Sequence, residues 1–503
     1  MASLKRLTAA LAGRGVPAPR ILDEFFTVDG VDTQAPGQVA LALVKRLLPA
    51  GVGADETLDA LDVPLFHHAL RLSVVCDASF EPLFIAARHR FLRSLADRSL
   101  RSDRRLKMMV SLACQCFNNE YIYPVPLDDR PQVEQLRARL EDALAQGRGE
   151  IDSDALAVYA MYAPLWTLRR AETLLGDSHP LTHSELETLI VGQIAAHRDE
   201  HRALTDIRSF SLGDQRTANA VRRQYEESPY PRWLSLTLER PRLLAETLAR
   251  IGGKAARIPA RPLNVLVAAC GTGKHPIAVA TRYSDVRVTA IDISATSLGY
   301  AARQARRYGV SNIEFLHGDL LHVEELGLVF DAIEAVGVLH HLENPEHGLR
   351  ALSRVLNKDG FIKLGVYSRR ARTHLDEFRR LLAESPDDDW RQIRQEMFDA
   401  ELPGRDRLLG MLDFYYSSGF RDLLRHAHEV VFTPLELGML LGRLGLSFLG
   451  YTNLDAAARH AYGQTFPEDP TMRDLRRIDQ YEDGHPHLFP SLQIAWVQKR
   501  QDS

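Results

Sequence analysis

The chain has 503 residues, of which 45% are hydrophobic and 25% are charged, a balance typical of globular proteins with a packed core. Its length predicts about two to four domains. The formal net charge of -4 argues against a large basic surface for nucleic acid, so no DNA partner is expected.

Four cysteines are too few for a disulfide framework, and their spacing matches no zinc pattern. We therefore expect reduced thiols, no metal site and a cytoplasmic protein. No apolar stretch reaches the ~18 residues that a membrane span requires, so no membrane partner is expected. The first 20 residues contain no acid and loosely resemble a transit peptide, but we interpret them as an amphipathic helix.

Residues 1–215 are expected to form a helical domain. Apolar side chains recur at helical spacing in 65–75, 80–96 and 106–117, and strand-like alternation is scarce. Glycine and proline mark breaks near 49–53, 123–130 and 178–180. Residues 216–261 are expected to form a linker and lid segment, because 251–262 supplies two glycines, two prolines and no apolar run.

Residues 262–503 are expected to form a Rossmann-like α/β domain. Short apolar runs alternate with helical segments, which is typical of a parallel sheet with right-handed crossovers. The last two strands are expected to pair antiparallel at one edge. A mostly helical insertion at about 370–435 interrupts the alternation. The pattern predicts seven strands, at 263–270, 286–292, 313–319, 330–339, 360–368, 446–452 and 492–499.

Three features lie at the carboxyl ends of the first three predicted strands, where such sheets bind ligands. The first is the glycine-rich turn Ala269-Cys270-Gly271-Thr272-Gly273, which can present free N–H groups to a ligand. The second is Asp292, 21 residues after Gly271, where an acid can accept hydrogen bonds from both ribose hydroxyls. The third is Asp319, where a carboxylate can accept from an adenine amine.

With these motifs the chain resembles class I S-adenosylmethionine-dependent methyltransferases, strongly over about 263–368 and more weakly over 430–499. The resemblance implies S-adenosyl-L-methionine as the cofactor. It implies that Gly271 and Gly273 pass under the methionine moiety and that Asp292 holds the ribose. The remaining positions implied to line the site are Ile293, Asp319 and Leu320 beside the adenine, and Val336 and Gly337 near the sulfonium.

The glycine-rich turn departs from the family at two positions. An acid usually lies two residues before the first glycine, and Val267 stands there, while Ala269 replaces the first glycine itself. Backbone carbonyls or a residue outside the sheet would then hold the amino group of the cofactor.

Two related classes of enzyme are disfavoured. A nicotinamide enzyme would need G-x-G-x-x-G where this turn reads G-T-G-K-H-P. Enzymes of the fold that act on DNA or glutamine usually carry a D/N-P-P-Y loop, and Val336-Gly337-Val338-Leu339 occupies that stretch.

Residues 224–233, here called the aromatic segment, contain two prolines, two tyrosines and a tryptophan. One interpretation is a lid in which Tyr225 or Tyr230 closes the methyl-transfer chamber as a catalytic residue and Arg232 meets a carboxylate. The other is a rigid linker whose aromatics fill a domain junction.

Further acceptor-side candidates follow the fourth and fifth strands. His340 could act as a base, or could be a packing residue beside His341. Glu334 lies within the fourth strand, where an acid must be paired or face the site. Tyr367, Arg369 and Arg372 would suit an acceptor carboxylate or phosphate, or form a solvated helix start.

The insertion gathers polar and aromatic side chains that would suit a cationic acceptor, although they could also lie on helix surfaces. These residues are Asp413, Tyr415, Tyr416, Arg421, Asp422, His426, His428 and Glu429.

We expect methyl transfer to a nitrogen or oxygen of a protein, peptide or amino-acid-like acceptor. The helical half would dock that acceptor, mediate a homodimer or add a wall to the site. Methylation of a small secondary metabolite is the second hypothesis, and a non-catalytic binding scaffold is the third. The helical half also gives the chain a resemblance to large bacterial methyltransferases with an extra helical N-terminal region.

Overall fold

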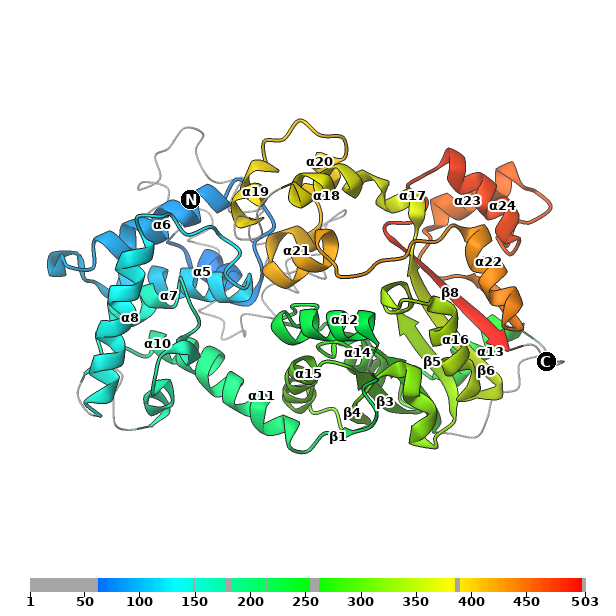
Figure 1. Ribbon diagram of the computed structural model, residues 1–503, viewed down its shortest axis with the longest axis horizontal. Helices are drawn as coiled ribbons and strands as arrows, with labels where there is room; N and C mark the ends of the chain where they lie inside the picture. Colours follow the sequence, from blue (N-terminus) through cyan, green and yellow to red (C-terminus); the bar gives the residue numbers. More distant parts are fainter. Residues whose placement is uncertain are drawn as a thin grey trace. The chain divides into compact units, whose positions relative to one another are not determined.

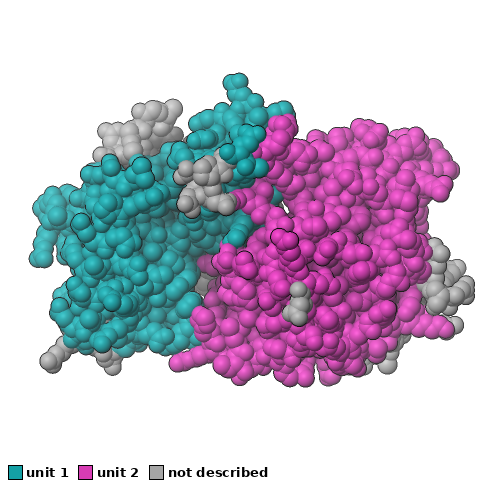
Figure 2. Space-filling view, viewed as in Figure 1, with its two compact units in different colours: residues 1–199, 381–423 teal, residues 200–380, 424–503 magenta. Residues whose placement is uncertain are grey.

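The computed structural model describes residues 62–147, 150–176, 183–213, 215–253, 262–384 and 390–499. The chain divides into two compact units, residues 1–199 with 381–423 and residues 200–380 with 424–503 (Figure 2). This division differs from the expected boundaries at 215 and 261, and it groups most of the insertion with the helical unit. The interpreted first helix and the breaks near 49–53 and 178–180 lie outside the described residues.

The first unit is helical in its described part, as predicted. The three apolar stretches form α5 (Pro64–Leu72), α6 (Glu81–Arg93) and α7 (Asp103–Asn118), and α8 (Arg130–Ala145) follows the predicted break at 123–130. The other α-helices that lie wholly within the described residues of this unit are α9 (Ser153–Tyr159), α10 (Glu185–Leu189), α19 (Trp390–Glu396) and α20 (Arg405–Leu409).

Short helical turns complete the first unit. A π-helical turn spans Ile190–Ala195, and 3₁₀ turns span Arg98–Leu100, Leu165–Thr167, Ala171–Leu175 and Leu412–Tyr415. Three longer helices, α11 (Ala196–Leu204), α18 (Asp376–Ala383) and α21 (Ser417–Leu424), begin or end near the unit boundaries.

A buried ion pair joins α6 to α19 inside the first unit. The Nη1 and Nη2 atoms of Arg394 donate to the two carboxylate oxygens of Glu81 at 2.6 and 2.9 Å, and its Nε donates to the Phe414 carbonyl at 2.7 Å. Glu81 is 3% exposed and Arg394 is fully buried. Burying either charge alone would cost a large desolvation free energy, and each side chain offsets that cost for the other.

The second unit contains one sheet of eight strands in the order β1-β4-β3-β2-β5-β6-β8-β7 (Figure 1). All neighbouring strands pair in parallel except β8, which is antiparallel to both β6 and β7. The strands are β1 (Arg208–Ser209), β2 (Leu263–Ala268), β3 (Val286–Asp292), β4 (Ile313–His317), β5 (Phe330–Val336), β6 (Leu356–Tyr367), β7 (Leu446–Tyr451) and β8 (Leu492–Lys499).

The predicted count of seven strands was wrong by one. Strand β1 contains two exposed residues, which pair with Leu316 and His317 of β4. Two residues are too few to show the alternation by which a strand is recognised in a sequence. The antiparallel pairing of the last two strands is confirmed.

Helices cover both faces of the sheet. Side chains of α13 (Leu244–Gly252), α14 (Lys274–Arg282) and α15 (Ala295–Arg307) pack on one face against Val265 and Val267. Side chains of α16 (Pro345–Arg354), α22 (Pro434–Arg443) and α24 (Leu475–Gly484) pack on the other face around Leu266. Successive residues of β2 therefore face opposite cores, which explains its nearly continuous apolar sequence.

The remaining helical segments described in this unit are α12 (Arg216–Glu227), α17 (Arg369–Arg372) and α23 (Ala456–Thr465), with 3₁₀ turns at Leu320–Leu326, Leu339–His341 and Thr373–Leu375. In the described part of the chain, no helix combines the length and apolarity needed to cross a membrane.

The strand order reverses direction between β2 and β5, which places a topological switch point at the carboxyl ends of these two strands. The chain leaves β2 into α14 on one face and leaves β5 toward α16 on the other. A sheet of this kind binds ligands where two adjacent strands send their connections to opposite faces. The predicted residues at the ends of β2 and β5 border this point, and those that follow β3 and β4 lie further along the same edge of the sheet.

Replacing Glu81 with Ala should destabilise the protein by about 3–5 kcal/mol, because Arg394 would remain buried without its counter-charge. Equilibrium denaturation would measure the loss. The control Glu134→Ala removes a carboxylate that is 71% exposed and 3.9 Å from Arg137, so it should change stability by less than about 0.5 kcal/mol. Equal losses in both variants would contradict the structural role of the buried pair.

Candidate functional site

The turn after β2 requires glycine at two positions. Gly271 and Gly273 have φ values of 53° and 86°. A Cβ on Gly271 would lie 2.5 Å from the Tyr230 carbonyl oxygen, and one on Gly273 would lie 2.5 Å from the Cβ of Ala301. Ala269 also adopts a positive φ, of 52°. The turn is therefore held tightly between the aromatic segment and α15.

Asp292 ends β3 with both carboxylate oxygens bonded to backbone. Gly271 N–H donates to Oδ2 at 2.6 Å, and Ser294 N–H donates to Oδ1 at 2.9 Å. Burial raises the pKa of this carboxyl to about 6, although these two hydrogen bonds oppose the shift. Each oxygen retains a second lone pair that could accept from a ligand hydroxyl.

Asp319 offers an unsatisfied acceptor two residues beyond β4. Its Oδ1 accepts from Leu321 N–H at 2.9 Å, whereas its Oδ2 is buried and has no hydrogen-bond partner among the described residues. Burial raises the pKa of this carboxyl above its ordinary value. An orphaned buried oxygen is costly unless a ligand or water donates to it, so it fits the exocyclic amine of an adenine.

The other predicted cofactor positions lie around the same edge. Ile293 and Val336 are half-buried, and Leu320 is buried at the start of the turn after β4. Gly337 has a φ of 86°, and a Cβ built there would meet no atom within 4 Å. Open space at the end of β5 and an orphaned acceptor at the end of β4 together fit an adenosyl ligand along this edge.

The aromatic segment is fastened to the glycine-rich turn. Thr272 N–H donates to the Tyr230 carbonyl at 3.2 Å, and the Thr272 hydroxyl donates to the Pro231 carbonyl at 2.6 Å. The Trp233 indole N–H donates back to the Thr272 carbonyl at 3.1 Å. Arg232 lies with its guanidinium 5.7 Å from the centre of the Tyr300 ring. This part of the segment is a fixed wall beside the turn.

The end of α12 caps α15. The Glu226 carboxylate accepts from Ala295 N–H at 2.6 Å and from Thr296 N–H at 3.2 Å, and the Ser294 hydroxyl donates to the Tyr225 carbonyl at 3.1 Å. A carboxylate at a helix N-terminus is stabilised by the free N–H groups and by the helix dipole. These bonds hold Tyr225 next to the residues that follow Asp292.

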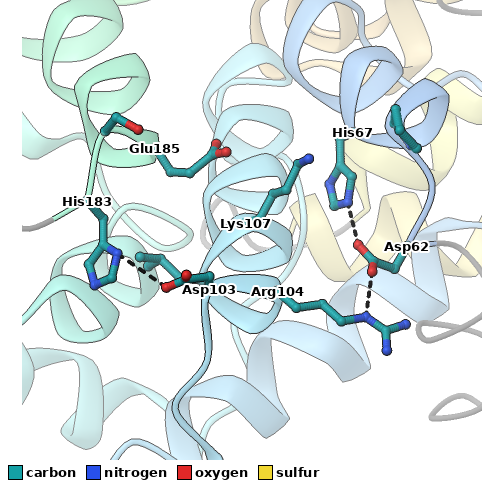
Figure 3. A pocket seen from close by; sticks show the side chains of 10 residues that line it. Asp62, His67, Asp103, Arg104, Lys107, His183 and Glu185 are labelled. Carbon is teal, nitrogen blue, oxygen red and sulfur yellow. Dashed lines mark hydrogen bonds and ion pairs between the residues drawn. The ribbon is translucent and has the colours of Figure 1, made fainter. Parts of the chain in front are cut away.

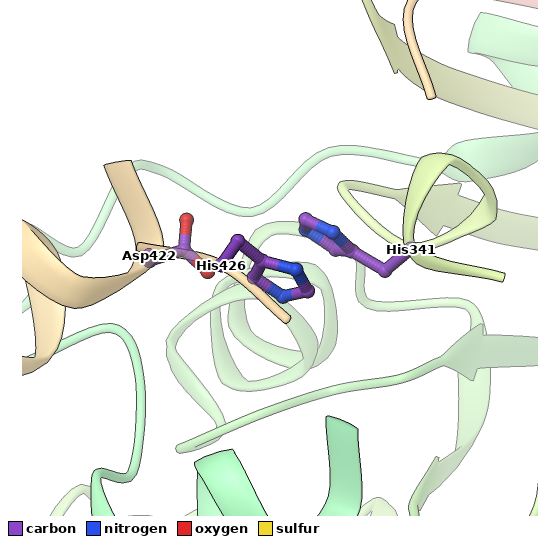
Figure 4. Close-up of side chains that lie close together, drawn as sticks. All are labelled: His341, Asp422 and His426. Atoms are coloured by element: carbon purple, nitrogen blue, oxygen red, sulfur yellow. The ribbon is translucent and has the colours of Figure 1, made fainter. Parts of the chain in front are cut away.

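The Tyr225 side chain contacts a pair of stacked histidines. The Tyr225 hydroxyl lies 3.0 Å from Nε2 of His426, whose ring stacks on the ring of His341 with centroids 3.6 Å apart (Figure 4). The same loop is held by Gln224, whose Oε1 accepts from Ala427 N–H at 2.9 Å. The structure thus brings a predicted residue of α12 together with a histidine of the predicted insertion.

His340 is completely buried, and neither of its ring nitrogens has a hydrogen-bond partner among the described residues. Its ring lies 3.8 Å from that of Tyr367 and 4.2 Å from that of His341, between centroids. Burial lowers the pKa of His340 well below its usual value, and the charge of Arg372 adds to the effect. The side chain is a neutral packing element in this conformation.

Arg372 lies across Tyr367, with its guanidinium carbon 3.6 Å from the ring centre. Its Nε and Nη2 donate to the Glu429 carboxylate at 3.0 and 2.7 Å, and Arg379 donates to the same carboxylate at 2.9 Å. Tyr367 is 9% exposed. Two arginines therefore neutralise Glu429 beside the histidine group.

Glu334 is paired within the sheet. His275 Nε2 lies 2.7 Å from its Oε2, and Lys363 of the neighbouring strand donates to that oxygen at 3.1 Å. These two groups lower the pKa of Glu334 to about 2, although burial opposes the shift. The arrangement satisfies the requirement that an acid within this strand be paired, and it keeps the carboxylate ionised.

The remaining predicted acceptor residues separate into two groups. Arg369 donates to Glu436 at 2.8 and 2.9 Å on an exposed surface, and the His428 backbone bonds to two neighbouring histidines. The others lie in the first unit, where Tyr415 donates to the Leu409 carbonyl and Tyr416 donates to Asp413. Those placed in the first unit are Asp413, Tyr415, Tyr416, Arg421 and Asp422.

Sequence reasoning missed Glu226 as a helix cap and His275 and Lys363 as partners of Glu334. Glu226 and Ala295 are 69 residues apart in the sequence, and His275 and Glu334 are 59 apart. Both separations are longer than the span of any local sequence motif. The one sequence signal for such partners was the acid within the buried strand β5, because a buried carboxylate requires a nearby cation, for example on an adjacent strand.

A separate cavity of about 640 Å³ lies in the first unit, lined by residues of α5, α7 and the start of α10 (Figure 3). Asp62 accepts from Arg104 at 2.5 Å and lies 2.7 Å from His67, while Glu185 accepts from Arg71 at 2.5 Å. Asp62 and Glu185 are thus paired with arginines of the protein, and the third acid, Asp103, is 93% exposed beside His183, so the cavity does not point to a particular ligand.

Comparisons with known proteins agree with this geometry. Residues 265–360 match a family model described as a methyltransferase domain. An uncharacterized protein of Synechococcus sp. is 32% identical over 224 residues, which cover 42% of this chain and 53% of that protein. The (S)-coclaurine N-methyltransferase of Thalictrum flavum subsp. glaucum is 30% identical over 99 residues, or 20% of this chain and 27% of that enzyme.

Among solved structures, PKMT2 from Rickettsia typhi in complex with AdoHcy is 16% identical, covering 53% of this chain and 55% of that chain with a TM-score of 0.39. The matched segments span about half or less of the length of the two curated relatives.

The family match confirms the resemblance drawn from the motifs at the ends of β2, β3 and β4. Residues 265–360, which lie in the sheet-bearing second unit, match a methyltransferase domain family, and enzymes of that family use S-adenosyl-L-methionine as the methyl donor.

Proposed function

We propose that the chain transfers a methyl group from S-adenosyl-L-methionine to a nitrogen or oxygen of a protein, peptide or amino-acid-like acceptor. The observation that carries this proposal is the orphaned Oδ2 of Asp319, which lies at the same sheet edge as Asp292 and the glycine-rich turn. Burying a hydrogen-bond acceptor without a donor costs free energy, so a domain that no longer bound a ligand would gain nothing from this arrangement.

The residues that would hold the cofactor lie on consecutive strand ends. Asp292 would accept from the ribose hydroxyls, Asp319 from the adenine amine, and Gly271 and Gly273 would leave room beside the methionine portion. When bound, the cofactor supplies a methyl carbon on a positively charged sulfur, which departs with the bonding electrons. The task of the protein is to align the acceptor and exclude water.

The acceptor would enter at the ends of β5 and β6, where His341, Tyr367 and Arg372 lie together with Tyr225 of α12. Fastening of the aromatic segment to Thr272 supports its role as a wall of this chamber. The first unit is a separate helical body that the sheet does not include. We propose that it docks the acceptor or mediates a homodimer.

A second candidate is methylation of a small secondary metabolite. Its support is that the 99-residue match includes an enzyme named (S)-coclaurine N-methyltransferase. Incubating a cell extract with the enzyme and methyl-labelled cofactor would separate the candidates. Label in macromolecules would support a protein acceptor, and label confined to small metabolites would exclude it. If calorimetry detected no binding of the cofactor or its demethylated product, both candidates and the proposed function would be rejected.

Substituting Asp292 with Ala should weaken cofactor binding by about 1–3 kcal/mol, because hydrogen bonds to an ionised group are lost. Isothermal titration calorimetry on both proteins would measure the change. The matched control is Glu314→Ala, which removes an exposed carboxylate from β4 and should leave affinity unchanged. Equal affinity in the wild type and Asp292→Ala would contradict the assignment of Asp292 to the ribose.

Cofactor affinity should also depend on pH through Asp292. Its pKa of about 6 means that the carboxylate able to accept two hydroxyl hydrogen bonds is depleted below that pH. Affinity should be flat above about pH 7 and fall about tenfold per pH unit below 6. Titrations from about pH 5 to 8 would check this, and Asp292→Asn should bind weakly with no such slope. The same slope in the variant would assign it to another group.

A further inference from the structure

The peptide groups of His428 fix the tautomers of two stacked histidines. The His428 N–H donates to Nδ1 of His426 at 3.0 Å, so that nitrogen carries the lone pair and the ring proton resides on Nε2. The His428 carbonyl lies 3.0 Å from Nδ1 of His341, so that nitrogen carries the proton and Nε2 carries the lone pair. One residue thus sets opposite tautomers in two rings.

These tautomers give the two rings different roles. His426 can donate from Nε2–H to the Tyr225 hydroxyl oxygen at 3.0 Å, which orients the phenol. His341 presents an Nε2 lone pair that has no hydrogen-bond partner within the described residues, and its side chain is 6% exposed. The two rings are parallel within 20°, so neither can rotate without disturbing the other (Figure 4).

We propose that His341 is the catalytic base of the methyl transfer, that it accepts the proton of a hydroxyl acceptor at Nε2, and that His426 is a positioning residue for Tyr225. This assignment rests on the proposed function and narrows it to O-methylation. It moves the base from His340, the residue favoured by the sequence, to the next residue along the chain.

His340 is unsuited to the role because its ring is wholly buried between Tyr367 and His341. An acceptor would have to displace one of those rings to reach it. His341 lies one position further, at the last residue of the 3₁₀ turn after β5, and keeps one nitrogen fastened to the His428 carbonyl. That bond would also stabilise the imidazolium formed when Nε2 takes a proton.

The strength of the base selects the acceptor. Burial lowers the pKa of His341 to about 3, and the charge of Arg372 contributes, while the bond to His428 opposes the shift. Such an imidazole cannot remove a proton from an alkylammonium, whose pKa is about 10. A hydroxyl oxygen, however, becomes strongly acidic as it gains a methyl group, so a weak neutral base suffices.

The proton and electron balance of the step is complete. The hydroxyl oxygen uses a lone pair to form the new bond to the methyl carbon, and the carbon–sulfur bonding pair remains on sulfur. The O–H bonding pair remains on oxygen as the proton moves to Nε2 of His341. The products are a methyl ether or ester, a neutral thioether and an imidazolium, which loses its proton to solvent.

Nitrogen NMR of the full chain labelled with ¹⁵N-histidine tests the tautomers without any acceptor. His341→Gln and His426→Gln assign the signals. We expect neutral rings at pH 7, with the proton of His341 on Nδ1 and that of His426 on Nε2. A proton on Nε2 of His341, or a charged ring, would overturn the proposal even if the cofactor binds, and would leave the proposed function intact.

Activity provides the second test, using extract and ¹³C-methyl-labelled cofactor. Carbon NMR of the product distinguishes O–CH₃ from N–CH₃, and we expect O–CH₃. His341→Gln should lower turnover by roughly 10²–10⁴-fold at unchanged cofactor affinity and unchanged melting temperature. The control His347→Gln, at an exposed histidine of α16, should keep full turnover. Labelled N–CH₃ alone, or full turnover in His341→Gln, would overturn the assignment.

A positioning role for His426 predicts a graded response. His426→Gln keeps an N–H that can donate to Tyr225, so it should retain more turnover than His426→Leu. Equal loss in both variants, with the KM for the acceptor unchanged, would contradict the orientation of Tyr225 by this bond.

Discussion

Two carboxylates held out of water at the edge of one parallel sheet impose the main constraint on this structure. Asp292 ends β3, and Asp319 follows β4 by two residues, while the register pairs Asp292 with His317. Strand pairing therefore fixes the distance between the two acids before any ligand arrives. Their burial is unfavourable to the charged form, and backbone N–H groups only partly offset that cost. A ligand with hydroxyl and amine donors would complete the compensation.

The wall of the site follows from the same constraint. Gly271 must approach both Asp292 and the Tyr230 carbonyl, so a side chain there would separate the turn from the aromatic segment. Glu226 then closes the arrangement by capping α15, the helix that begins just after Asp292. Asp292 and Tyr225 are thus linked through one short stretch of backbone. A lid hinged at residues 230–233 would have to break the bonds to Thr272.

The gathering of Gly271, Asp292 and Asp319 at one sheet edge was predictable from the sequence, whereas the contacts around Tyr225 and the histidines were not. Residues at successive strand ends of a parallel sheet must meet at one edge, so Gly271, Asp292 and Asp319 could be placed together from spacing alone. No comparable rule joins Tyr225 to His426, which are 201 residues apart. The insertion shows the same limit, because Tyr415 and Tyr416 pack within the first unit. An amphipathic helix reveals that it has a buried face, but its sequence does not identify the surface that covers that face.

Burial gives the two adjacent histidines a neutral state that the sequence alone does not suggest. Two adjacent histidines after a strand suggest a group that titrates near neutral pH, and His340 was the first of them. In the fold, burial and Arg372 lower the pKa of both rings, so neither is charged at neutral pH. What then distinguishes them is which nitrogen carries the lone pair. That property depends on a backbone carbonyl 87 residues away in sequence, and only the folded chain brings it to His341. A base this weak is useful only when the acceptor becomes acidic during the reaction, which ties the chemistry of the site to the depth at which the fold buries it.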